Sequence, residues 1–135
     1  MEKTQKKTPE VRFPEFKEDW KNRPLNELLY HSTVLNTDLK YGKKEVLSVS
    51  REAGIVNQIE YLGRSYAGVS VHNYGVVEVG DLVYTKSPLK NNPYGIIKMN
   101  EHKAGIVSTL YAVYKINPKT AFSNFLKHYF YCYYY

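Results

Sequence analysis

The alternation of apolar and polar positions is most regular between Val76 and Ile116. β-Branched and aromatic residues recur there at every second position, and glycine, proline and asparagine interrupt them at short intervals. This combination is typical of strands joined by turns. The predicted strands are Val76–Val79, Leu82–Thr85, Gly95–Lys98, Gly105–Ser108 and Leu110–Ile116. We therefore expect a small meandering sheet in this part of the chain.

Two other stretches show the spacing of a helix. Leu25, Leu28 and Leu29 follow Pro24 at positions i, i+3 and i+4, which predicts a short amphipathic helix that faces the core. A second helix is predicted after Thr120, whose side chain is expected to cap it. Its apolar residues recur with helical spacing: Phe122, Phe125, Leu126, Tyr129 and Phe130.

The first half of the chain adds an arm and a further strand. Apolar residues around a proline predict an extended arm over residues 11–16, which Trp20 is expected to anchor on the core. Residues 45–51 alternate in character, with Leu47 and Val49 on one face, as in a half-buried strand.

Together, the length and these elements favour one domain. A chain of 135 residues can bury a core without covalent cross-links. We expect the α+β class, in a single domain with a twisted, mostly antiparallel sheet and a few short helices. Residues 1–10 are predicted to be a disordered tail, residues 11–119 the domain itself, and residues 120–135 the start of a truncated helix.

Cysteine content and the lack of long apolar runs indicate the cytoplasm. Cys132 is the only cysteine, so the chain can form neither an internal disulfide nor a cysteine cluster for a metal. No apolar run approaches the roughly 18 residues that a membrane span needs. The four histidines are scattered, without the spacing of metal ligands. We therefore expect a cytoplasmic protein that binds no metal and no cofactor.

Basic residues and tyrosines are concentrated in the second half. Residues 1–60 contain eleven Lys and Arg against ten Asp and Glu, whereas residues 61–135 contain eight against three. The second half also contains twelve of the fourteen tyrosines. Interleaved cations and phenol rings suit a polyanion such as DNA, which presents phosphates to the cations and bases to the rings. A merely basic surface explains the same composition equally well.

Several short strings follow one another in an order that matches a known family. They are Arg12–Phe16 before Trp20 and Leu25, Leu47–Arg51, Gly54–Val56, Glu78–Tyr84, Gly95–Lys98, Gly105–Ser108 and Tyr111–Tyr114. In their order and spacing these strings resemble the target-recognition domain of the specificity subunit of type I restriction-modification enzymes. The resemblance covers nearly the whole chain after its first ten residues.

The resemblance implies a recognition subunit without catalytic activity of its own. In that family the domain reads one half of a bipartite target in the major groove of double-stranded DNA. Separate modification (methyltransferase) and restriction (nuclease) subunits carry out the chemistry, so the resemblance implies both as partners, the second through the first. Full-length specificity subunits have two such domains, separated by long helices that pair. We therefore expect a fragment or half-subunit, with self-association through the aromatic residues 129–135 as a further expectation.

Residue type and loop position indicate the candidate DNA contacts, since these domains differ in what they read. One loop contains side chains that can contact base edges: Arg64, Ser65, Tyr66, His72 and Asn73. A second loop, stiffened by two prolines, contains Lys86, Ser87, Lys90, Asn91 and Asn92. The candidate phosphate contacts are Lys40, Lys43 and Lys44. Solvated loops are the alternative interpretation of all three groups.

Two other patterns point to different functions. Residues 91–94, Asn-Asn-Pro-Tyr, are similar to the loop with which adenine methyltransferases hold a flipped base, but no glycine-rich cofactor motif accompanies them. Asp81 with Glu101 and Lys103 matches a loose pattern of metal-dependent nucleases, although Glu101 is expected in a polar hairpin turn over residues 99–105. The alternatives are therefore a standalone DNA-acting enzyme or a non-functional, dimerising remnant.

Overall fold

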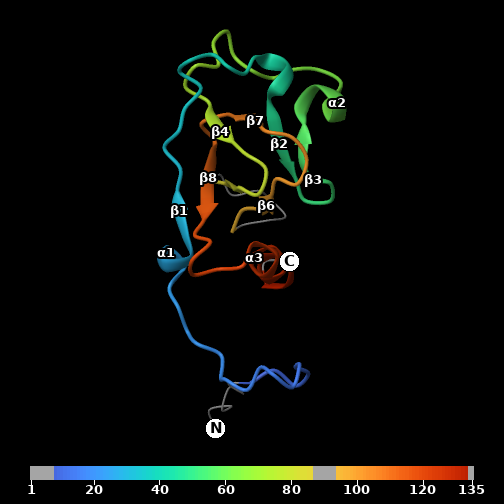
Figure 1. Ribbon diagram of the computed structural model, residues 1–135. Coiled ribbons are helices and arrows are strands. Elements are labelled where there is room, and N and C mark those ends of the chain that lie inside the picture. The colour runs from blue at the N-terminus through green and yellow to red at the C-terminus, as the bar shows by residue number, and fades with distance from the viewer. Residues whose placement is uncertain (1–7, 87–93, 134–135) are drawn as a thin grey trace.

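The computed structural model describes residues 8–86 and 94–133 (Figure 1). Its elements follow in the order α1 (Leu25–Leu28), β1 (Leu29–His31), the 3-10 helix η1 (Lys43–Glu45), β2 (Leu47–Ser50), β3 (Gly54–Asn57), α2 (Gln58–Leu62), β4 (Gly75–Val77), β5 (Leu82–Thr85), β6 (Ile97–Met99), β7 (Gly105–Val107), β8 (Tyr111–Ile116) and α3 (Ser123–Tyr133). Short helices and antiparallel strands confirm the predicted α+β class. No helix within the described ranges is both long and apolar enough to cross a membrane.

Four strands form the central sheet, in the order β1-β8-β5-β6. Every neighbouring pair in this sheet is antiparallel. β8 lies inside the sheet, where Val113 pairs with Val83 of β5 and Ile116 pairs with Leu29 of β1. Because side chains alternate along a strand, β5 and β8 send apolar side chains to both faces of the sheet, and both faces need a cover.

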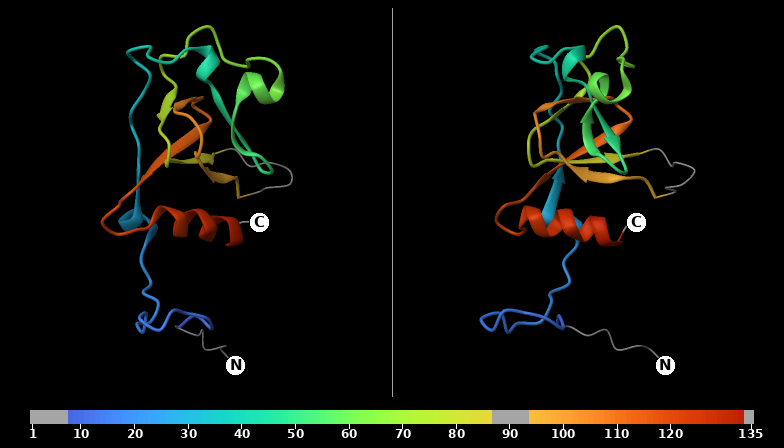
Figure 2. Two further views of the ribbon diagram at one scale, coloured as in Figure 1. Left: turned by 45° about the vertical axis from the view of Figure 1, so that its right-hand side comes forward. Right: turned by 90° about the vertical axis from the view of Figure 1, so that its right-hand side faces the viewer.

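α3 covers one face of the central sheet, and two strand pairs cover the other (Figure 2). On the first face, Leu126 and Phe130 of α3 are buried with Leu82 of β5. On the second face the buried residues come from the sheet, from β2–β3 and from β4–β7: Leu47, Ile55, Val77, Val83, Val107 and Val113. Full burial of an aliphatic side chain contributes about 1.5–3 kcal/mol relative to exposure, so both layers stabilise the sheet.

The strands of the second half do not form the predicted meander. β4 pairs with β7, outside the central sheet, whereas β5 pairs with β6 and β8. Gly80 adopts a left-handed conformation, with φ 94°, and turns the chain between β4 and β5, as the Gly80-Asp81 dipeptide predicts. Residues 100–104 carry the chain from the central sheet to β7, so they are not the expected hairpin turn. Alternation specifies the face that a side chain occupies, but it does not specify the partner strand.

The helix predicted from Leu25 is shorter than expected. α1 ends at Leu28, and Leu29 begins the edge strand β1 by pairing with Ile116. Leu29 is buried beside α3, whereas Leu25 is exposed. The gain from burying Leu29 against the sheet overrides the local helical spacing of the leucines.

One helix was not predicted at all. α2 follows β3 directly and begins at Gln58. The Oδ1 atom of Asn57 accepts hydrogen bonds from the backbone N–H groups of Ile59 and Glu60, which caps the helix. Gly63, with φ 79°, ends it in the left-handed conformation. Asn57 and Gly63 are the sequence signals that could have located this helix.

The second predicted helix is present as α3, but its cap is not Thr120. The hydroxyl of Thr120 donates instead to the carbonyl of Glu27 at 2.6 Å, and so ties the entry to α3 to the end of α1. Phe125 and Tyr131 remain 48% and 66% exposed, whereas Leu126 is only 2% exposed. The helix is therefore buried along one stripe and not all round.

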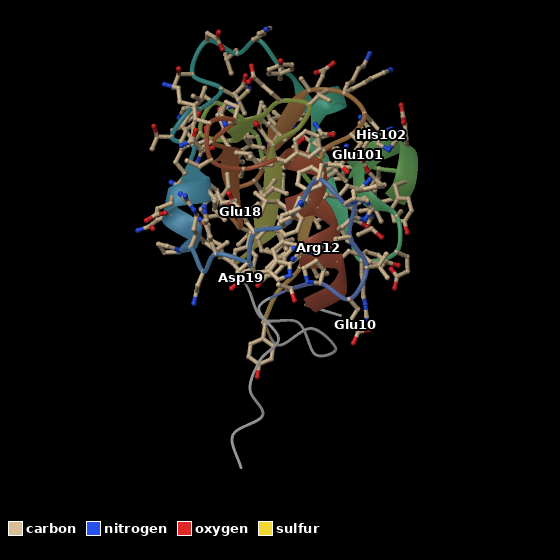
Figure 3. The ribbon with its side chains drawn as sticks, turned by 60° about the horizontal axis from the view of Figure 1, so that its bottom comes forward. Glu10, Arg12, Glu18, Asp19, Glu101 and His102 are labelled. Atoms are coloured by element: carbon tan, nitrogen blue, oxygen red, sulfur yellow. The ribbon has the colours of Figure 1, made fainter. Side chains whose placement is uncertain are left out.

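The N-terminal arm packs less than expected. Phe13 and Phe16 remain largely exposed, and the guanidinium of Arg12 donates to the carbonyls of Phe16 and Glu18, which curls the arm back on itself (Figure 3). Trp20 is 57% exposed and lies 5.9 Å, centroid to centroid, from the ring of Phe125. The prediction that Trp20 docks on the core is thus wrong, because its contact is with the outer side of α3. Residues 1–7 of the predicted tail lie outside the described residues.

Candidate nucleic-acid interface

Two of the three predicted groups of DNA contacts lie together at one end of the molecule. We call residues 36–44 the first loop and residues 63–74 the second loop; both lie at the top of Figure 1. The Asn36 side chain connects them, because its Nδ2 atom donates to the carbonyls of Tyr41 (2.7 Å) and Val71 (3.2 Å). Its Oδ1 atom accepts the N–H of Tyr41 at 3.1 Å. With Asn36 fully buried, one amide side chain fixes the conformation of both loops.

Apolar packing beneath the loops fixes their position on the strands. Val46, Val71 and Ile106 form a small buried cluster between the two loops and β7. The rings of Tyr41 and Tyr74, one from each loop, pack partly buried against it. The loops are therefore held on the β4–β7 pair, at a distance from the layer formed by α3.

The second loop exposes a cation and an aromatic ring side by side. The guanidinium carbon of Arg64 lies 4.6 Å from the centroid of the Tyr66 ring, and both side chains are exposed. Such a pair presents donors for base edges or phosphates and a flat surface for stacking. Ser65, by contrast, shapes the loop, since its hydroxyl accepts the N–H of Ala67 at 3.1 Å.

The rest of the second loop presents polar groups to solvent. His72 Nδ1 lies 2.7 Å from the hydroxyl of Ser70, so one ring nitrogen has a partner within the loop. Asn73 follows and is exposed. Both side chains are positioned to contact a ligand that approaches this end of the molecule.

The first loop exposes all three of its lysines. Lys40 lies beside Tyr41, with Nζ 5.3 Å from the ring centroid. Lys43 and Lys44 lie on η1, and the N–H of Gly42 at the start of η1 donates to the Glu45 carboxylate at 2.7 Å. The hydrogen bond between Gly42 and Glu45 holds the backbone of η1 in place, and the ammonium groups of the three lysines remain in solvent.

The third predicted group cannot be placed as a whole. Ser87, Lys90, Asn91 and Asn92 lie outside the described residues, as does the methyltransferase-like loop up to Pro93. Lys86, at the end of β5, is exposed, and its Nζ donates to the carbonyl of Thr109 at 3.0 Å.

A groove of about 630 Å³ beside η1 contains further candidates that were missed from the sequence. Tyr61 of α2 and the polar pair His102-Lys103 line it together with Lys44. Asn100, 1% exposed, shapes this wall, because its amide donates to the Lys103 carbonyl and accepts the N–H of His102. Asn100, His102 and Lys103 were expected in a hairpin turn. They line the groove beside η1 because β6 and β7 do not pair with each other. His102 is labelled in Figure 3.

Charges in this groove are balanced. Its lining contains the two lysines Lys44 and Lys103 and the two glutamates Glu45 and Glu60. Direct attraction of phosphate by the groove is therefore weak, and hydrogen bonding is the interaction that its walls favour. Phosphate contacts are better supplied by the exposed lysines of the first loop.

The acidic residues of the second half, Glu78, Asp81 and Glu101, form ion pairs with lysines. Lys115 Nζ lies 2.8 Å from Glu78 Oε2 and 3.0 Å from Asp81 Oδ2. The hydrogen bond from Lys115, together with its positive charge, lowers the pKa of Glu78. Burial lowers the pKa of Lys115, but hydrogen bonds to Glu78 and Asp81 outweigh this effect, so the net change is a raised pKa. Glu101 pairs with Lys127 of α3 at 2.6 Å. These carboxylates therefore form ion pairs with lysines of β8 and α3, and Glu78 also attracts Lys40 of the first loop through its charge.

Both carboxylates of the nuclease-like pattern form ion pairs with lysines. Asp81 binds Lys115, and Glu101 binds Lys127. Over residues 8–86 and 94–133, no group of three or more His, Cys, Asp and Glu side chains could hold a metal.

Comparison with known proteins supplies no relative. No protein-family model, no curated protein and no solved structure matches this chain.

Proposed function

We propose that this chain is a target-recognition domain of the type I restriction-modification specificity subunit, which binds DNA and directs separate methyltransferase and nuclease subunits to their target. The order of the short sequence strings suggests the family. The observation that supports DNA binding most directly is the single surface formed by the two loops, with Asn36 buried between them. This surface exposes the lysines of the first loop and the Arg64–Tyr66 pair of the second loop, and the hydrogen bonds of Asn36 hold its backbone in place.

Within this proposal the loops have different roles. Lys40, Lys43 and Lys44 contact phosphates, which positions the protein on any duplex. Arg64 and Asn73 contact base edges in the major groove, where each base pair has a distinct pattern of donors and acceptors. The strands and α3 serve as the scaffold.

The outer side of α3 is the proposed site of the protein partners. Phe122 and Phe125 remain 72% and 48% exposed, and Trp20 lies against Phe125. Exposed aromatic groups of this size are common at interfaces between proteins. The modification subunit, or a second copy of this chain, would cover them.

A salt titration of DNA binding tests the proposed interface. The chain is co-expressed with the modification subunit of the same genome, its preferred duplex is selected from a random library, and Kd is measured against salt concentration. Lys43→Ala is expected to weaken binding to all sequences alike and to reduce the salt slope by about one unit, because one phosphate contact is lost. Arg64→Ala is expected to reduce discrimination between sequences by about 1–3 kcal/mol.

Lys119→Ala is the matched control, since it removes the same charge from an exposed position in the connection between β8 and α3. Its salt slope should equal that of the unchanged protein. Equal losses in Lys43→Ala and Lys119→Ala would mean that the basic surface binds DNA without a defined interface. Absence of salt-dependent binding in the complex would reject the proposal altogether.

A further inference from the structure

A pocket on the α3 side of the central sheet is lined mainly by aromatic rings. Its volume is about 500 Å³, within the usual range for small-molecule sites. α1, β1, β5, β6, β8 and α3 all contribute to it, so it lies well away from the two loops at the top of Figure 1. The aromatic side chains of its lining are His31, Tyr84, Tyr94, Tyr114 and Phe130. Tyr30 also borders the pocket, but it pairs with Lys115, so its ring belongs to the other face of β1.

Hydrogen bonds and ring contacts already hold several walls of the pocket in place. The hydroxyl of Tyr84 donates to the carbonyl of Tyr94 at 2.9 Å, which joins β5 to the segment before β6. On the opposite side, the rings of His31 and Tyr114 meet edge to face, with centroids 5.5 Å apart. A ligand would therefore find these rings largely ordered, which reduces the entropy lost on binding.

Glycine at position 95 is part of the pocket wall. Gly95 is buried and has φ 82°, a conformation that other residues rarely adopt. A Cβ atom there would lie 2.5 Å from the carbonyl oxygen of Thr85 and 2.7 Å from the Tyr84 ring. The backbone thus approaches the Tyr84 ring as closely as glycine alone permits, and this approach fixes the ring.

The chemistry of the lining defines the kind of ligand. Among the described residues, no Lys, Arg, Asp or Glu lines the pocket, so this lining favours an uncharged ligand. Tyrosine rings favour flat aromatic groups, which stack on them or meet them edge to face. Asn26 and His31 add hydrogen-bonding groups for a polar edge.

From these features we propose that the pocket binds a neutral heteroaromatic ring of nucleobase size. The ring comes either from a free nucleoside or from an unpaired nucleic-acid strand, since both present the same flat, polar-edged group. This proposal is independent of the duplex-binding surface, because no residue of the two loops lines the pocket.

Binding of three probes to the full chain tests the proposal. Adenosine and a short single-stranded oligothymidylate both present such a ring, whereas ribose does not. Saturation-transfer NMR is expected to show contact with the ring protons of adenosine and no contact with ribose. His31→Ala and Tyr94→Ala are expected to raise the Kd for adenosine or the oligonucleotide about tenfold, because each removes a stacking surface. His31 is exposed and Tyr94 is 81% exposed, so both variants should keep the fold, which circular dichroism verifies.

Tyr131→Ala is the matched control, because Tyr131 is 66% exposed and does not line the pocket. Binding of adenosine supports the pocket with a free ligand as its source, and binding of the oligonucleotide alone supports it with an unpaired strand. Failure of both probes to bind overturns the inference, as does an equal loss of affinity in Tyr131→Ala. Duplex binding by the His31 and Tyr94 variants should be unchanged, so failure of the pocket to bind either probe leaves the proposed function intact.

Discussion

At the scale of single residues, Gly105 is a glycine whose position leaves no room for a side chain. It is buried at the start of β7, where a Cβ atom would clash with the carbonyl oxygen of Glu45 and lie 2.9 Å from Cγ of Leu47. Backbone cannot move aside as the end of a flexible side chain can. The close approach lets β2 lie directly against β7.

Gly105→Ala is expected to lower the free energy of unfolding by about 1–3 kcal/mol, as overpacking of a core does. Urea denaturation followed by circular dichroism measures the change. Gly68→Ala is a suitable control, because the nearest atom to its Cβ lies at 4.0 Å. A Gly105→Ala protein as stable as this control would show that the β2–β7 contact is looser than described.

Some of these residues could be predicted from the sequence and others could not. The Gly80-Asp81 turn follows from the backbone preferences of the two residue types, which act locally. The requirement for glycine at position 105 depends on η1 and β2, which lie about sixty residues earlier in the chain. The residue pattern around position 105 does not indicate which distant backbone segment will lie against it.

At the scale of elements, the two loops depend on the side chain of Asn36. Asn36→Ala would leave the N–H of Tyr41 without its partner in a partly buried position, and the Val71 carbonyl would keep only the N–H of Tyr74. Because an unsatisfied buried polar group costs about 1–3 kcal/mol, the loops should open more often than the strands beneath them.

Hydrogen exchange, read segment by segment, is the appropriate measurement for Asn36→Ala. We expect faster exchange in residues 36–44 and 63–74 and little change in β5 and β8. The matched change Asn73→Ala, at an exposed asparagine of the second loop, should leave exchange unaltered. Uniform acceleration across the whole chain would indicate instead that Asn36 supports the entire fold.

The elements themselves were predicted unequally well. Strands of the second half were located because β-branched alternation is a strong local signal. The leucines at Leu25, Leu28 and Leu29 fit a helix equally well, and only pairing with β8 converts the last of them into a strand. Likewise, the sequence placed lysines in one loop and polar residues in another, but it could not show that Asn36 joins them or that Lys103 and Lys44 line one groove.

At the scale of the whole molecule, stability should depend on pH through the cluster of Lys115, Glu78 and Asp81. The pKa of Glu78 is lowered from its ordinary value of 4.5, so its contribution is present above that value and is lost as the pH falls through the folded-state pKa. The pKa of Lys115 is raised from 10.5, so its contribution is present below 10.5 and is lost as the pH rises through the higher folded-state value.

Urea midpoints measured across the pH range test this dependence. The unmodified protein should lose stability on acidification below about pH 4.5, and Glu78→Gln should lose less over the same interval. Glu78 is largely exposed, so solvent screening keeps the difference small. Glu15→Gln, an exposed change in the N-terminal arm, is expected to follow the unmodified protein. Identical acid profiles for Glu78→Gln and the unmodified protein would contradict the assigned role.

The pairing of β1 with β8 also determines when the fold can be completed. Leu29 has its partner in Ile116, so the first strand of the central sheet meets its neighbour only after nearly the whole chain is available. During synthesis on a ribosome, β1 must therefore wait unpaired while some eighty further residues emerge. Contacts between such distant segments slow folding. A nascent chain that stalls before β8 would expose an unpaired strand, and this makes early termination a route to aggregation.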